Sequence, residues 1–501
     1  MLKVLLINTY LTRKESERVY PLEPLGLLCL ATYLKKEAQS NSLKNIDIKI
    51  FDAQMEGGDK TIIAERGYRS GIDDLGLIKF VKKYKPDIVG ISNNYTTHLN
   101  DVLEISKTIK EIIPRCLLFL GGAHATIDHE NLIKFKWIDG VVRGEGEITF
   151  KEIVFSVYFN KNLSNIKGLT FKKENRIFIN KERELIEDIN TLPIPDRNFL
   201  DYKKYLEKTP QIYFSPMNSP IGTIFTARGC PFNCIFCSTQ KVWKNKWRPR
   251  SPEKIFDEIN YLIKTFGVKE ISLEDDQFMF SKERIKNLCN LIIKNKLNIT
   301  LIVPSGISPS LIDIETMQLM KKAGFYRLCF SIDVGTPLAK NFVRKPVNLG
   351  KMRDLIKKAN HLGFFTYATF VIGFPFEKEE DIQKTIDYSY NLKLDFLRFY
   401  IAQPHLGSDL YDIYLKEGLI NKTVLSEHHT MFDSSFGTKY LSKDKVLELR
   451  DEAENNYLKS HINDFFNFNY LFYEFLPKIK NINQFVYLLK MFKNFSDTKK
   501  K

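Results

Sequence analysis

The sequence lacks the features that define membrane and secreted proteins. No apolar run among its 501 residues reaches the roughly 20 residues that a membrane-spanning helix needs. The apolar start, residues 1–8, has no small-residue cleavage site after it, so it indicates a first strand rather than a signal peptide. We therefore expect a cytoplasmic protein with no transmembrane segment.

Cysteine is scarce, and its distribution excludes a disulfide framework. The chain has seven cysteines, and three of them fall within eight residues. Small disulfide-stabilised domains instead spread paired cysteines along a secreted chain. The other four lie singly in apolar surroundings, which predicts core residues. They are Cys29, Cys116, Cys289 and Cys329.

The chain also lacks a basic block, although its formal net charge is +15. Its lysines are scattered over the whole length, which favours solvated lysine-rich faces over a nucleic-acid surface. We expect no nucleic-acid partner.

The first 150 residues alternate between strand and helix patterns. Apolar strands are predicted at 3–8, 46–52, 87–92, 117–120 and 137–142, with helices at 24–36, 77–84 and 99–113. This alternation predicts an α/β domain over 1–150 with a doubly wound parallel sheet of the Rossmann or flavodoxin type.

Ligands of such sheets lie outside the carboxyl ends of the strands. The candidate binding residues there are Asn8, Thr9, Ser92, Asn93, Gly121, Gly122, His124, Gly144 and Glu145. Glycine allows the backbone to approach a large flat ligand closely. The same glycines also fit ordinary tight turns, so both interpretations stay open.

Residues 151–215 are interpreted as a hairpin and a linker. The hairpin spans 168–180 and turns at Glu174 and Asn175. Pro193 and Pro195 then enforce an extended segment, which makes this the best domain boundary in the chain.

Strand and helix alternation resumes with longer helices in residues 216–440. Strands are predicted at 223–226, 270–273, 300–303, 327–331, 366–372 and 396–401. Six such units predict an open, partial (β/α)6 barrel of the TIM type, with its chemistry on the loops that follow the strands. A helical region, 441–501, follows.

Cys230, Cys234 and Cys237 lie on the loop after the first barrel strand. A structural zinc site would need a fourth ligand, usually from a second Cys or His pair, and no such pair follows at zinc-finger spacing. Three thiolates do suit a [4Fe-4S] cluster that leaves one iron open, where an amino group and a carboxylate can chelate it.

This Cys-x-x-x-Cys-x-x-Cys segment, with Phe236 before its last cysteine, resembles the signature of the radical SAM superfamily. The resemblance covers 221 to about 440. It implies that S-adenosylmethionine binds the open iron and is cleaved reductively to a 5′-deoxyadenosyl radical.

The Gly-Gly-Ala-His loop from Gly121 and the Arg-Gly-Glu-Gly-Glu segment from Arg143 resemble the cobalamin-binding domain found ahead of many radical SAM domains. The Asp-x-His-x-x-Gly motif of other cobalamin domains is absent. The resemblance therefore implies cobalamin whose lower face has no protein imidazole from the first loop.

The resemblance also implies residues for S-adenosylmethionine. Asp275 or Asp276 suits the amino group, although the same acidic run could simply precede a helix. Asp333 stands where the Ser-x-Glu-x-Gly segment has glutamate. Arg344 or Lys345 could meet the carboxylate or face solvent. The full candidate set is Phe236, Asp275, Asp276, Ser305, Ser331, Asp333, Arg344 and Gly373.

Substrate-facing candidates are Tyr400 and His405, although a lone histidine is more often structural. An aromatic-rich stretch near the end could form a lid or cover the domain's open side. Its members are Phe465, Phe466, Phe468, Tyr470, Phe472, Tyr473 and Phe475.

Together, these resemblances imply an enzyme that methylates an unactivated carbon, or phosphorus, of a small molecule, and that takes electrons from a reductant such as flavodoxin or ferredoxin. Cobalamin-assisted ring formation or rearrangement is the alternative. Transfer-RNA methylthiolation would need three further N-terminal cysteines, and only Cys29 and Cys116 lie there. A non-catalytic metal-binding module also stays open.

Overall fold

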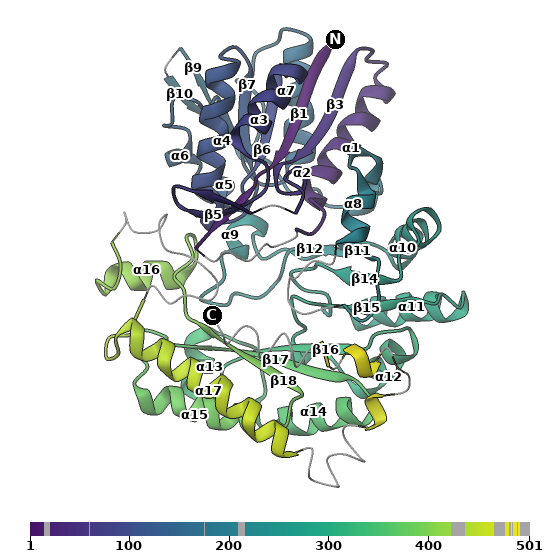
Figure 1. Ribbon diagram of the computed structural model, residues 1–501, viewed down its shortest axis with the longest axis vertical. Coiled ribbons are helices and arrows are strands. Elements are labelled where there is room, and N and C mark those ends of the chain that lie inside the picture. Colours follow the sequence, from purple (N-terminus) through teal and green to yellow (C-terminus); the bar gives the residue numbers. More distant parts are fainter. Residues whose placement is uncertain are drawn as a thin grey trace. The chain divides into compact units, whose positions relative to one another are not determined.

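The computed structural model describes residues 1–14, 21–59, 61–174, 176–208, 216–421, 436–464, 476–479, 482, 484–487 and 489–490. The chain divides into two compact units, Met1–Ile212 and Tyr213–Lys501 (Figure 1). None of the helices in these described ranges is both long and apolar enough to cross a membrane.

The first unit is built on one seven-stranded sheet with the order β10-β9-β8-β7-β6-β1-β3. Its five parallel strands are β1 (Leu2–Asn8), β3 (Ile46–Asp52), β6 (Ile88–Ser92), β7 (Leu117–Gly121) and β8 (Gly140–Val142). Their spatial order runs second, first, third, fourth and fifth along the chain. This is the flavodoxin-like arrangement, and it confirms the predicted doubly wound sheet.

Helices cover both faces of this sheet (Figure 1). The long ones are α1 (Leu25–Ser40), α3 (Asp74–Tyr84), α4 (Leu99–Ile112) and α7 (Gly146–Tyr158). Residues of α3 and α4 belong to one buried cluster with alternate residues of β1, β6 and β7. On the other face, Phe150 of α7 lies beside Gly90 and Leu6.

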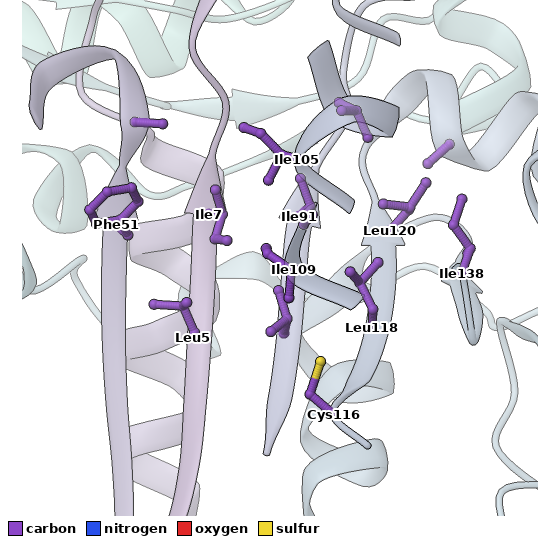
Figure 2. Close-up of a cluster of buried hydrophobic side chains, with 14 of the residues drawn as sticks. Leu5, Ile7, Phe51, Ile91, Ile105, Ile109, Cys116, Leu118, Leu120 and Ile138 are labelled. Atoms are coloured by element: carbon purple, nitrogen blue, oxygen red, sulfur yellow. The ribbon is translucent and has the colours of Figure 1, made fainter. Parts of the chain in front are cut away.

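Figure 2 shows the α4 side of this core. Leu5, Ile7, Ile91, Leu118 and Leu120 are at most 2% exposed, and they alternate along their strands as a period of two residues requires. Burying each such side chain contributes about 1.5–3 kcal/mol. The predicted core positions of Cys116, Cys289 and Cys329 are confirmed, whereas Cys29 is half-buried.

The predicted hairpin forms, but it belongs to the first sheet. Strands β9 (Leu169–Lys173) and β10 (Arg176–Ile179) pair antiparallel, and β9 also pairs antiparallel with β8. Leu169 and Phe171 are buried, which explains why the hairpin packs on the sheet edge. The short helix α8 (Tyr202–Glu207) completes the first unit, so residues that we assigned to a linker are part of a folded unit.

A small antiparallel sheet was not predicted. It consists of β2 (Leu11–Arg13), β5 (Gly67–Ser70) and β4 (Thr61–Ala64). Strands of three or four residues are too short to show a hydrophobic period.

The second unit contains six parallel strands in chain order. They are β11 (Ile221–Ile224), β14 (Glu270–Leu273), β15 (Thr300–Ile302), β16 (Arg327–Asp333), β17 (Phe365–Ile372) and β18 (Phe396–Ile401). They form two three-stranded sheets, which the parallel bridges Leu301–Phe325 and Ile307–Phe330 join. The predicted partial barrel is therefore confirmed.

Helices separate these strands along the chain. They are α10 (Pro252–Phe266), α11 (Lys282–Lys294), α12 (Ile314–Lys322), α13 (Pro337–Val343), α14 (Met352–His361) and α15 (Glu379–Tyr390). Their ends follow standard capping chemistry. In α10, for example, the Ser251 side chain accepts from the Lys254 N–H, Pro252 is the first helical residue, and Gly267 ends the helix at φ 67°.

The predicted C-terminal helix is α17 (Lys443–Asp464), which packs beside β18. Glu454 on this helix accepts a hydrogen bond from the Phe399 N–H over 2.9 Å and pairs with Arg398 over 3.2 Å. The helix thus satisfies one backbone donor of β18, the strand beside which it packs. The aromatic stretch from Phe465 to Phe475 lies outside the described residues.

Candidate active site

The three clustered cysteines lie on one closed loop of the second unit. Strands β12 (Ala227–Arg228) and β13 (Arg248–Pro249) pair antiparallel and join the two ends of the loop. The short helix α9 (Thr239–Trp243) follows Cys237 within it. We call residues 227–249 the cysteine loop.

Gly229 allows the cysteine loop to close. Its φ is 84°, and a Cβ atom there would lie 2.2 Å from the carbonyl oxygen of Lys246. Only glycine fits this position without a backbone shift. The Gly229 N–H donates to Asp276 Oδ2 over 3.3 Å, and the Trp243 side chain also hydrogen-bonds to Asp276.

Backbone hydrogen bonds fix the loop between the cysteines. The Ile235 N–H donates to the Val343 carbonyl at the end of α13 over 3.2 Å. The Ile235 carbonyl accepts from the Leu410 N–H over 2.9 Å, in the first turn of α16 (Asp409–Lys416). Two helices thus position the segment that joins Cys234 to Cys237.

The three thiols are mutually close and partly shielded from water. Burial is the main cause that raises the pKa of Cys230 to about 12 and that of Cys234 to about 11, and charge on neighbouring cysteines contributes to both values. Burial also raises the pKa of Cys237, whose sulfur lies 2.9 Å from Thr239 Oγ1. Ligation must therefore displace protons, so iron binding here depends on pH.

Within the described part of the chain, no three His, Cys, Asp or Glu side chains converge tightly enough to share one metal ion. A cubane cluster does not require such convergence, because each thiolate binds a different iron. Three sulfurs on one fixed loop therefore fit a cluster better than a mononuclear metal.

Asp275 anchors the strand that enters the cysteine loop. Its carboxylate accepts from the Thr226 and Ala227 N–H groups over 2.6 and 3.1 Å, and from the Thr226 hydroxyl. Arg284 donates to the Thr226 carbonyl over 3.1 Å. Burial raises the Asp275 pKa, and the Arg284 charge opposes that shift. This carboxylate is already fully engaged within the protein.

Asp276 is different, because its side chain is exposed. Burial of the carboxylate by the surrounding protein, followed by the charge of Asp275, raises its pKa to about 6. The residue as a whole thus reaches solvent, while the protein around its carboxylate accounts for the raised pKa. Of the two acidic candidates, Asp276 is the one with room for a ligand ammonium group.

Ser305 lies on the loop after β15, and Ser331 lies on the next strand, β16. The Ser305 hydroxyl donates to the Asp275 carbonyl over 2.6 Å. Ser331 Oγ packs against Gly306, where a Cβ would come within 2.2 Å of that oxygen. Gly306 has a φ of 92°, so glycine is required there on two grounds.

Asp333 forms a largely buried ion pair with Lys345. Its Oδ2 lies 2.5 Å from Lys345 Nζ, and the Thr369 hydroxyl donates to Oδ1 over 3.0 Å. The neighbouring Arg344 instead pairs with Asp409 over 2.5 Å at an exposed position. Of these two cations, Lys345 is the one that acts on the thiols, because its positive charge partly offsets the rise in the Cys234 pKa that burial causes.

Gly373 lies at the end of β17 with a φ of 82°. A Cβ there would lie 2.9 Å from Val446 of α17. The Gly373 and Phe374 N–H groups donate to Glu377 Oε2 over 2.7 and 2.9 Å. Burial raises the pKa of Glu377 to about 7, and these two hydrogen bonds oppose the shift.

Tyr400 shares a face of the sheet with Ser331 and Thr369. Ser331 aligns with Thr369, and Val371, two residues further along β17, aligns with Tyr400. Tyr400 also hydrogen-bonds to Tyr367, and burial raises its pKa. His405 is exposed, burial lowers its pKa, and its carbonyl accepts from Ser408 at the start of α16. Phe236 is half-buried within the cysteine loop.

In the first unit, the candidate residues gather at the carboxyl ends of the parallel strands. Asn8 aligns with Asp52, and Ser92 with Gly121, at the last positions of their strands. Asp52 is buried, accepts from the Asn8 side chain, and accepts from Tyr205 over 2.5 Å. Thr9, directly after β1, is buried as well.

Several buried polar atoms at this edge have no hydrogen-bond partner among the described residues, although His124 Nε2 lies 3.9 Å from Asp128 Oδ2. They include both side-chain amide atoms of Asn93, Nε2 of His124 and the hydroxyl of Tyr10. Asn93 is 0% exposed and His124 is 4% exposed, with its Nδ1 held 3.0 Å from Thr96 Oγ1. A ligand rich in amide donors and acceptors would satisfy these atoms.

Each of the two glycine loops at this edge has a glycine with a positive φ, a conformation that other residues rarely adopt. Gly122 has a φ of 111°, and a Cβ there would lie 2.5 Å from Asn94 Oδ1. Gly144 has a φ of 72° and open space around it, and its N–H donates to Thr126 Oγ1 over 2.9 Å. Glu145 is engaged internally, because it accepts from the Ile186 N–H over 2.7 Å.

Comparison with known proteins identifies a family for each of the two domains. Residues 224–389 match the Radical SAM superfamily, and residues 16–154 match the B12 binding domain. An uncharacterized methyltransferase of Pyrococcus horikoshii is 30% identical over 431 residues, which cover 86% of each chain. Cytidylyl-2-hydroxyethylphosphonate methyltransferase of Streptomyces wedmorensis is 27% identical over 84% of this chain and 83% of its own.

A solved structure shares the fold. The radical S-adenosylmethionine methyltransferase TsrM from Kitasatospora setae, with cobalamin and a [4Fe-4S] cluster bound, aligns with a TM-score of 0.68 at 18% identity. The alignment covers 85% of this chain and 80% of that one.

The fold and the cysteine loop thus define a radical SAM domain that follows a B12-binding domain. The chain belongs to the cobalamin-dependent radical SAM methyltransferases. Its cofactors are a [4Fe-4S] cluster, S-adenosylmethionine and cobalamin, and both the three-thiol donor set and the unpartnered amide atoms fit them.

Four contributors escaped the sequence prediction. Glu377 binds two backbone N–H groups, but it lies four residues past the glycine that drew attention. Thr226 and Arg284 support Asp275 from positions that carry no motif. The Gly229 contact with Lys246 could have been suspected, because an Arg-Gly-Cys sequence often places glycine where a loop turns back.

Proposed function

We propose that this enzyme methylates an unactivated carbon, or phosphorus, of a small-molecule substrate. When bound, the cluster cleaves S-adenosylmethionine reductively to a 5′-deoxyadenosyl radical, and cobalamin carries the methyl group. The cysteine loop is the main observation behind this proposal, because its three thiols are fixed beside one accessible acid and one buried lysine.

The residues around the loop have complementary charges for the methionine end of S-adenosylmethionine. Asp276 is an accessible anion that suits the ammonium group. Lys345 supplies a positive charge that suits the carboxylate, and Asp333 orients it. Gly373, which has no side chain, leaves backbone for the flat adenine to lie against.

The proposed reaction consumes two molecules of S-adenosylmethionine and two electrons per methylation. One molecule supplies the methyl group and leaves as S-adenosylhomocysteine. The second leaves as methionine and 5′-deoxyadenosine, the latter having taken the substrate hydrogen. The electrons come from a low-potential reductant such as flavodoxin or ferredoxin. A cytoplasmic location suits thiols that must stay reduced.

Methyl-labelled S-adenosylmethionine tests the reaction type. The reconstituted enzyme is incubated anaerobically with candidate substrates, including the cytidylyl-2-hydroxyethylphosphonate named for the Streptomyces relative. We expect labelled product, S-adenosylhomocysteine and 5′-deoxyadenosine in equal amounts. An unlabelled product from a competent reaction would contradict methylation and favour ring formation or rearrangement.

A further inference from the structure

Reductive cleavage requires an electron, so an electron donor must come close to the cysteine loop. The following inference rests on the proposed function and concerns where that donor binds. Beside the loop, the described part of the second unit has a surface that combines an aromatic cluster, of which one ring is exposed, with exposed lysines.

Three aromatic side chains form this surface, which we call the loop patch: Phe280 contacts both Phe232 and Trp247, which are half-buried. The Phe280 ring centroid lies 5.1 Å from that of Trp247 and 6.4 Å from that of Phe232, with edge-to-face geometry in both pairs. Phe280 is 44% exposed although it is a large apolar residue. A cluster of aromatic rings at the surface, rather than one isolated ring, is typical of an interaction site.

The cysteine-loop side of the loop patch is basic, whereas the exposed acids Asp276 and Glu283 lie near Phe280 in the sequence. Residues 227–250 contain six basic and no acidic residues. Three of them are exposed lysines, namely Lys241, Lys244 and Lys246. Because these side chains reach solvent, they contribute positive charge to the surface that an approaching partner meets.

The loop patch is adjacent to a cluster ligand. Phe232 lies two residues after Cys230, and its backbone N–H donates a hydrogen bond to the Cys230 thiol. An electron that arrives at the patch therefore has a short path to a ligand sulfur. Electron transfer is faster over a short path, so a donor is more effective if it binds at the loop patch than if it binds at the outer helices of the barrel.

We propose that the loop patch is the docking surface for an acidic one-electron donor protein with a flavin or iron–sulfur centre. The three lysines attract the donor, and the aromatic rings form the small apolar contact typical of transient electron-transfer encounters. The donor passes one electron to the cluster, and is itself oxidised by one electron, before it dissociates.

The test separates protein-driven from chemical reduction. The full-length reconstituted enzyme is assayed for 5′-deoxyadenosine with either a reduced bacterial flavodoxin or dithionite as the electron source. Flavodoxin binding is measured separately by calorimetry. The variant reverses three charges (Lys241→Glu, Lys244→Glu and Lys246→Glu), and the matched control reverses three exposed lysines on α11, α14 and α15 (Lys294→Glu, Lys357→Glu and Lys384→Glu).

We expect the loop-patch variant to lose about 10-fold in flavodoxin affinity and flavodoxin-driven rate at low salt, with a smaller loss at high salt. Its dithionite-driven rate and iron content should match the wild type, and the control variant should be unchanged in every assay. A Phe280→Ser variant should also weaken flavodoxin binding.

Equal flavodoxin affinity in the loop-patch and control variants would overturn the docking proposal. A wild-type enzyme that releases no 5′-deoxyadenosine even with dithionite would instead contradict the proposed function. The two failures are therefore distinguishable.

Discussion

The Asp276 carboxylate accepts a hydrogen bond from the Gly229 N–H, at the residue immediately before the first cysteine of the loop. The residue proposed to bind the ammonium group of S-adenosylmethionine therefore also fixes the ligand loop of the cluster. Two different substitutions of Asp276 can distinguish its role in binding the ligand from its role in anchoring the loop.

Asp276→Asn keeps an oxygen acceptor for Gly229 but removes the negative charge. We expect normal iron content and about 10-fold weaker binding of S-adenosylmethionine, since a charge-assisted hydrogen bond becomes a neutral one. Asp276→Ala should also lose iron, because the loop loses its anchor. Iron analysis and equilibrium dialysis measure both effects, and unchanged ligand affinity in Asp276→Asn would exclude the ammonium contact.

Lys345 and Arg344 are neighbours with opposite environments. Lys345→Met leaves Asp333 largely buried without its cation, and we expect a loss of about 3 kcal/mol in unfolding free energy. Arg344→Met breaks an exposed pair and should cost less than about 1 kcal/mol. Denaturant unfolding of the two variants compares them directly, and equal losses would mean that the Lys345–Asp333 pair is not buried.

Glu377 predicts a specific pH dependence of stability. Its pKa is raised from 4.5 to about 7, so between these values the folded chain binds a proton that the unfolded chain has released. The stability that this proton provides is fully present below about pH 4.5 and is lost as the pH rises through 7.

Glu377→Gln cannot lose a proton, and it keeps an oxygen for the Gly373 and Phe374 N–H groups. As the pH rises from 5 to 7.5, the free energy of unfolding of the variant should therefore increase relative to that of the wild type by up to about 3 kcal/mol. The exposed Glu380→Gln serves as control, with a difference that stays flat over that range. A flat difference for Glu377→Gln as well would show that its pKa is ordinary.

The buried amide of Asn93 is expected to lower the stability of the cofactor-free protein and to contribute to cofactor binding. Its buried, unpartnered amide costs on the order of 1–3 kcal/mol in the cofactor-free chain. Asn93→Leu should raise the thermal midpoint of the cofactor-free protein and reduce the corrinoid that co-purifies with it, whereas the exposed Asn131→Leu should do neither. Undiminished corrinoid in Asn93→Leu would rule out a contact with the cofactor.

The sequence predicted the architecture well where elements were long or motifs dense. The strands from Glu270 and Phe396 were predicted with the same bounds that the structure has, because buried parallel strands are short apolar runs between polar loops. The hairpin was recognised from its turn, but the edge that it joins depends on pairing with β8, a contact that no local pattern encodes.

The candidate site was predicted in its residue types rather than in its partners. The acidic run after β14 was noticed. The sequence could not show, however, that the Asp275 carboxylate accepts hydrogen bonds from Thr226 while Asp276 stays accessible to a ligand. Likewise, Arg344 and Lys345 are equivalent cations in the sequence. The end of α13 turns one toward Asp409 and the other toward Asp333.

The most direct test of the central claim is 5′-deoxyadenosine release from S-adenosylmethionine by the anaerobically reconstituted chain with dithionite. We predict that the wild type releases 5′-deoxyadenosine and methionine in equal amounts, and that Cys234→Ala releases neither. A wild-type chain that contains the full iron complement and releases no more 5′-deoxyadenosine than Cys234→Ala would contradict the assignment of the cysteine loop.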